Sequence, residues 1–78
     1  MSIYKNMYAQ KLFDILAPII GELMSKGAIR SQCNKLGINE ETIQKKDLLQ
    51  IAEGIRKAMM LFVGTDGARQ ISDRIIKL

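Results

Sequence analysis

The chain has 78 residues, and its 12 Lys and Arg against 8 Asp and Glu give a formal net charge of +4. This length fits one domain, residues 1–78, which buries only about 60% of the surface that its unfolded chain exposes. One cysteine and no histidine exclude an internal disulfide and a zinc site of the usual kind, and we expect no metal or cofactor.

Helices are favoured by the composition. Hydrophobic residues make up 47% of the chain, but it has only two Tyr, two Phe and no Trp. The core must therefore consist of Ile, Leu, Met and Ala, and these residues suit packed helices better than a β-sandwich.

The first predicted helix is long and covers residues 3–24. Its apolar residues recur every three or four positions, as Tyr4, Tyr8, Leu12, Ile15, Ile19 and Leu23. Pro18 lies inside this run, where it removes a hydrogen bond at a cost of about 3 kcal/mol. Either the helix kinks there, or one helix ends near Leu16 and another begins at Pro18. The stripe keeps its phase across the proline, which favours a kink.

A short second helix is predicted at residues 28–36, after a break at Lys26-Gly27. Gly37 is its expected C-terminal glycine, and Ile38 is the apolar residue that folds back onto it. Asn39 is placed to cap a further short turn, and Ile43 is the apolar residue that attaches this turn to the core.

The central predicted helix, residues 47–64, organises the rest of the chain. Asp47 is its expected N-cap, with Gln50 reaching back to it, and Gly64 is the residue expected to close it. A stripe at helical spacing predicts the buried face, which consists of Leu48, Ile51, Ala52, Ile55, Met59 and Phe62.

The last predicted helix begins at Thr65 or Asp66 and runs to Leu78. Its apolar face carries Ala68, Ile71, Ile75 and Leu78. The elements together predict an all-α domain, a small irregular or orthogonal bundle of four to five helices. In this bundle the long first helix packs against a buried central helix.

The second half of the central helix is apolar on every side, from residue 58 to residue 63. Such a segment needs cover all round, and a chain of this size offers few residues to provide it. Methionine is flexible and suits binding surfaces, and a symmetric dimer is the commonest way to cover such a face. We therefore expect a homodimer, or a complex with another protein, through Met59, Met60, Phe62, Val63, Tyr8 and Leu12.

Catalysis finds little support in the residue types. Histidine, the usual general base, is absent. The eight carboxylates stand at positions typical of helix caps or exposed helix faces. Cys33 lies on the inward face of the second helix, where a thiol behaves as a small hydrophobe. The sequence predicts a protein that is not an enzyme.

Residues 29–48 carry one family pattern. Cys33, Gly37 and Ile43 have the spacing of a small residue, a turn glycine and a branched apolar residue. This segment resembles the DNA-binding helix-turn-helix, in which two steeply crossing helices need a small contact and a left-handed turn. The resemblance implies a recognition helix that begins near Asn39. Its candidate DNA-binding residues are Arg30, Lys35, Asn39, Thr42, Gln44 and Lys45.

Two functions from different classes therefore stay open. The first is a small self-associating interaction module, and the alternative is a helix-turn-helix regulator that uses residues 29–48. The basic residues are dispersed among acidic ones, which favours the first. We expect no membrane partner, because the most apolar run, ILAPII, is too short to span a bilayer. An unpaired cysteine and no export signal predict a cytoplasmic protein.

Overall fold

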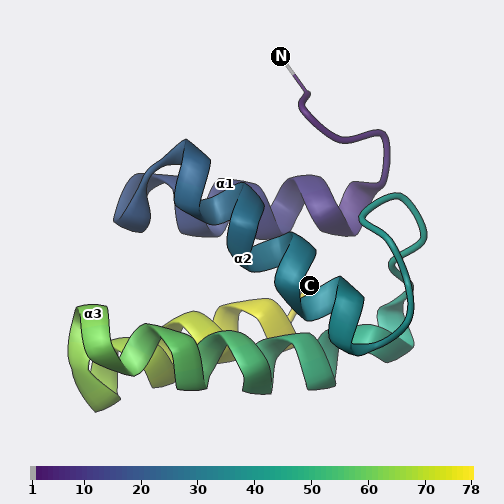
Figure 1. Ribbon diagram of the computed structural model, residues 1–78. Helices are drawn as coiled ribbons and strands as arrows, with labels where there is room; N and C mark the ends of the chain where they lie inside the picture. The colour runs from purple at the N-terminus through teal and green to yellow at the C-terminus, as the bar shows by residue number, and fades with distance from the viewer. Residues whose placement is uncertain (1) are drawn as a thin grey trace.

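The computed structural model describes residues 2–78, and helices dominate it (Figure 1). They are α1 (Met7–Ile20), α2 (Glu22–Lys35), a 3₁₀ turn η1 (Lys45–Asp47) and α3 (Leu48–Ile76), with no strand among the described residues. The all-α prediction is confirmed. The predicted four to five helices are wrong in number, because the structure has three α-helices and one 3₁₀ turn.

The first helix is shorter than predicted. It begins at Met7, with Asn6 as its N-cap, and it ends at Ile20. The C-cap residue Gly21 has a φ of 87° and a ψ of 166°, which lie outside the helical region. Glycine adopts such a positive φ at little cost, whereas other residues do not. Pro18 lies inside α1, so the alternative of a second helix starting at Pro18 is also wrong.

The second helix starts earlier than predicted, because Gly27 does not break it. Ser25 is fully buried one turn after the bend, and its hydroxyl donates to the Gly21 carbonyl over 2.6 Å. At the C-terminal end of α2, the prediction that Ile38 folds back onto the helix after Gly37 is confirmed. The Ile38 N–H donates to the Cys33 carbonyl over 3.0 Å, and Ile38 packs partly buried against the core.

The third helix is continuous from residue 48 to residue 76 except at Gly64. There φ is 76° and ψ is 175°, which is nearly the conformation of Gly21. The predicted break at Gly64 is thus confirmed. Figure 1 shows the first arm of α3 in green and the second arm, in yellow, running back in the opposite direction. The fold consists of two helical hairpins, each turned at a glycine.

All three helices contribute to one core. Its buried apolar residues are Ala9, Leu12, Phe13, Ile15, Leu16, Ile29, Cys33, Ile43, Leu48, Ile51, Ala52, Ile55, Met59, Ala68, Ile71 and Ile75. The side chain of Gln32 on α2 lies against α3 at Gly54, where an added Cβ would overlap it. Gln32 itself is only 7% exposed, so it fills the space that Gly54 leaves.

Asn6 joins the N-terminal segment to the loop between α2 and η1. Its Oδ1 accepts from the Ala9 N–H over 3.0 Å, and its Nδ2 donates to the carbonyls of Glu41 and Ile43 over 3.2 and 2.9 Å. The backbone N–H of Asn6 also donates, to Glu41 Oε1 over 2.7 Å. One side chain therefore caps α1 and also fixes a loop that lies 35 to 37 residues away in the sequence.

Replacement of Asn6 tests how much this cross-link stabilises the fold. Asn6→Ala removes a helix cap and two long-range hydrogen bonds, and we expect it to lower the free energy of unfolding by about 2–3 kcal/mol. Urea unfolding followed by circular dichroism measures the change. Asn6→Ser is the matched control, because serine still caps α1 but is too short to reach both loop carbonyls, so its loss should be smaller. Equal stability of wild type and Asn6→Ala would contradict this account.

Candidate functional site

Six large apolar side chains are exposed at the two glycine bends. Ile19, Leu23 and Met24 flank Gly21, and Met60, Leu61 and Phe62 precede Gly64. All six are at least 40% exposed, and the largest exposed fractions are 84% for Leu23 and 93% for Leu61. We call these six residues the apolar end.

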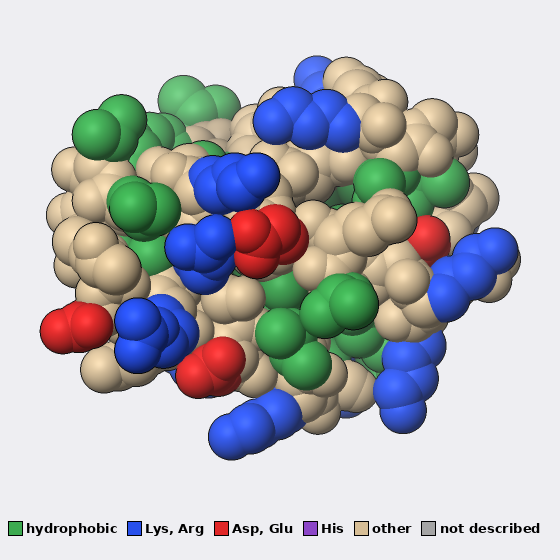
Figure 2. Space-filling model, turned by 90° about the horizontal axis from the view of Figure 1, so that it is seen from below, with side chains coloured by type: hydrophobic (Ala, Val, Ile, Leu, Met, Phe, Trp, Pro, Cys, Tyr) green, Lys and Arg blue, Asp and Glu red, His purple; other side chains and the backbone are tan. Residues whose placement is uncertain are grey.

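Both bends lie at the same end of the molecule. Figure 1 shows the turn from α1 into α2 and the bend of α3 at the left. In Figure 2, which views the molecule from below, hydrophobic side chains are visible at that same left end, and others lie in the middle and on the right of this face. The side chains on the inner side of each helix, such as Leu16 and Met59, enter the core. Those on the outer side of a bend have no further helix among residues 2–78 to cover them.

The structure places the six predicted interface residues in three different environments. Leu12 is fully buried and Met59 is 2% exposed, so both belong to the chain's own core and are not available to a partner. Tyr8 and Val63 are half-buried against that core. Only Met60 and Phe62 are exposed, and both belong to the apolar end.

The two most exposed residues of the apolar end, Leu23 and Leu61, are not among the predicted interface residues. The apolar stripe places Leu23 inward on a helix that extends to residue 24, but the bend at Gly21 turns it outward. Leu61 lies in the run that is apolar on every side. The exposure of Leu61 could have been inferred from the sequence, because a helical segment that is apolar on every side and ends at a glycine break must expose at least one of its sides.

The predicted recognition helix at Asn39 is not formed. Asn39 Oδ1 accepts from the Glu41 N–H over 2.8 Å, and the Thr42 hydroxyl donates to the Asn39 carbonyl over 3.1 Å, which completes one isolated turn. Such side-chain bonds to the backbone compete with helix formation. As predicted, Ile43 attaches the turn to the core, at 3% exposure.

The start of α3 also differs from the prediction. The Asp47 side chain makes no hydrogen bond to the first turn of α3. It accepts instead from the Gln44 N–H over 2.8 Å, in a capping box that belongs to η1. The predicted capping box between Asp47 and Gln50 is therefore wrong, because the chain enters α3 through a 3₁₀ turn that uses the Asp47 side chain.

The six candidate DNA-binding residues do not share one helix. Arg30 and Lys35 lie on α2, and Arg30 Nε pairs with Glu40 Oε1 over 3.2 Å. Asn39 and Thr42 hold the isolated turn, while Gln44 and Lys45 are exposed where η1 begins. DNA binding by these residues stays a prediction.

Cys33 is buried, at 1% exposure. Burial raises the pKa of its thiol to about 11, and the charges of Glu40 and Asp47 contribute to the rise. A thiol that keeps its proton at neutral pH is a poor nucleophile and metal ligand. Within residues 2–78, no three His, Cys, Asp or Glu side chains gather in a group that could hold a metal ion.

No described helix has the length and apolar character needed to cross a membrane. Comparison of the chain with protein-family models, curated proteins and solved structures found no significant match.

The raised pKa of Cys33 predicts a fall in stability at alkaline pH. Between the ordinary thiol pKa of 9.0 and the folded value of about 11, the unfolded chain loses this proton first. The free energy of unfolding should then drop as pH rises, by on the order of 1–2 kcal/mol. Urea unfolding at pH 8 and above pH 10 measures this slope. In Cys33→Ala the free energy of unfolding should fall less steeply over this pH range, because the thiol is gone. Equal slopes in the two proteins would show that the Cys33 thiol does not cause the fall.

Proposed function

We propose that this chain is a small interaction module without catalytic activity, and that it self-associates through the apolar end. The observation that carries the proposal is the presence of six exposed large apolar side chains at one end of the molecule. Extended apolar surface is costly to leave in water, and on folded proteins it usually marks a place where another molecule binds.

The size of the apolar end fits a second copy of the chain. The exposed fractions of the six residues add up to between three and four fully exposed side chains. At about 200 Å² each, this amounts to roughly 700 Å², close to the ~800 Å² that each partner contributes to a stable protein–protein interface. A symmetric dimer uses the same surface twice, so it covers both exposed leucines, Leu23 and Leu61, on both copies.

The chemistry of the chain supports a binding role over a catalytic one. The sequence has no histidine, and its only thiol is buried with a raised pKa. DNA binding through residues 29–48 has less support, because that segment holds a single turn where the second helix of the motif would stand.

A charge placed at the centre of the apolar end tests the proposal. Leu61→Glu puts a carboxylate where a second copy would bury a leucine, and we expect the dissociation constant to rise about a hundredfold or more. Because Leu61 is 93% exposed, the fold of each protomer should not change. Analytical ultracentrifugation over a concentration series measures the dissociation constant.

Leu49→Glu is the matched control. Leu49 is 65% exposed at the start of α3, away from the bend, so the same change there should leave association intact. The proposal fails if the wild-type chain is monomeric at high micromolar concentration. It also fails if the Leu49 variant weakens association as much as the Leu61 variant does.

A further inference from the structure

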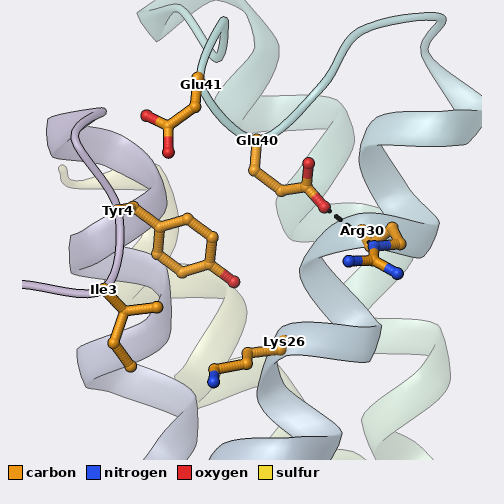
Figure 3. Close-up of a pocket in the computed structure, with 6 residues that line it drawn as sticks. All are labelled: Ile3, Tyr4, Lys26, Arg30, Glu40 and Glu41. Carbon is orange, nitrogen blue, oxygen red and sulfur yellow. Dashed lines mark hydrogen bonds and ion pairs between the residues drawn. The ribbon is translucent and has the colours of Figure 1, made fainter.

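A pocket of about 300 Å³ opens between the N-terminal segment, α2 and the turn after it. Figure 3 shows the side chains around it, from three separate parts of the chain. The lining residues are Ile3, Tyr4, Lys26, Arg30, Glu40 and Glu41. None of them belongs to the apolar end.

Both carboxylates of the pocket already have partners within the chain. Glu41 accepts from the backbone N–H groups of Lys5 and Asn6, over 3.3 and 2.7 Å. Glu40 accepts from Arg30 Nε over 3.2 Å. These bonds hold the N-terminal segment and the turn against α2, and they use three of the four carboxylate oxygens of Glu40 and Glu41.

The hydrogen-bond donors of the pocket are less engaged. Lys26 forms no ion pair with any residue that the structure describes, and the Tyr4 hydroxyl has no hydrogen-bond partner among them. Arg30 uses its Nε for Glu40, which leaves its two terminal nitrogens available. In Figure 3 the Tyr4 hydroxyl points toward α2, between Lys26 and Arg30. Lys26 and Arg30 are four residues apart, on one face of that helix.

The ring of Tyr4 is held in place by the core. It packs edge-on against Phe13, with 6.1 Å between ring centroids and 65° between ring planes. Burial raises the pKa of the Tyr4 hydroxyl, and Glu40 adds to this, so the group stays protonated and able to donate. Next to it, Ile3 gives the pocket an apolar wall.

We propose that this pocket binds the oxyanion of a small organic molecule, a carboxylate or a phosphate. Three of its four carboxylate oxygens accept hydrogen bonds within the chain, while the Lys26 ammonium, the terminal nitrogens of Arg30 and the Tyr4 hydroxyl remain to donate to a ligand. Hydrogen bonds between charged groups are stronger than those between neutral groups, and a guanidinium group matches the geometry of both carboxylate and phosphate. A volume of about 300 Å³ lies at the small end of the range for ligand sites. The proposal does not depend on self-association.

An NMR titration tests the proposal on the full chain. Inorganic phosphate, acetate and butyrate are added to ¹⁵N-labelled protein at constant ionic strength, with chloride as the replacing salt. We expect saturable shifts of the Ile3, Tyr4 and Arg30 amides. Phosphate binding best would identify a phosphate source. Butyrate binding better than acetate would identify a carboxylate whose tail lies on Ile3.

Two variants locate the site. Lys26→Gln should weaken binding about tenfold, because it removes one charge-assisted hydrogen bond. Lys57→Gln removes the same charge from α3, outside the pocket, and should leave binding within about twofold. Tyr4→Phe keeps the ring and removes only the hydroxyl, so it should weaken binding several-fold. The absence of saturable shifts with all three anions would overturn the proposal. Equal weakening by the Lys26 and Lys57 variants would also overturn it, since it would indicate diffuse attraction to a basic protein.

Discussion

Two glycines hold a backbone conformation that other residues adopt only at a cost, and the rest of the structure depends on them. Gly21 and Gly64 both combine a positive φ with an extended ψ. Each reverses the chain within about one residue, so that the next helical segment can pack against the core already begun. Buried residues on both sides of each bend, such as Leu16 and Ile29, or Met59 and Ile71, then belong to one cluster.

The same bends explain why the two ends of the molecule differ. At one end, Asn6 and Glu41 bind the N-terminal segment to the loop after α2 through hydrogen bonds. At the other end, each hairpin turns without a neighbouring helix outside it, and the outward side chains there are apolar. Leu23 and Leu61 are the clearest case, because each lies only two or three residues from its glycine and is almost fully exposed. Polar contacts close one end, and large apolar side chains stay exposed at the other.

Much of the core was predictable because the apolar stripes are periodic. Ile51, Ile55 and Met59 are buried as their spacing indicates, and so are Ile71 and Ile75. The bend at Gly21 was not predictable in this way, because the stripe keeps its phase as far as residue 23 and Pro18 is the more obvious interruption. A proline in the last turn of α1 removes only one hydrogen bond, whereas the backbone of Gly21 leaves the helical region altogether.

Other features could not be deduced from local patterns. The bonds of Asn6 join segments at least 35 residues apart, and nothing near Asn6 in the sequence indicates its partners. The spacing of Cys33, Gly37 and Ile43 correctly marks the end of α2, but it does not reveal the conformation of the residues after Gly37. There Asn39 and Thr42 satisfy the backbone of one turn, so no second helix forms.

We propose that the surface made by the two bends binds a second copy of the chain. Isotope-filtered NMR on a mixture of labelled and unlabelled protein tests it most directly, because only contacts between different molecules give a signal. The account predicts such contacts from the Leu23 and Leu61 methyl groups. Contacts confined to other surfaces, or no contacts in a sample at high micromolar concentration, would contradict it.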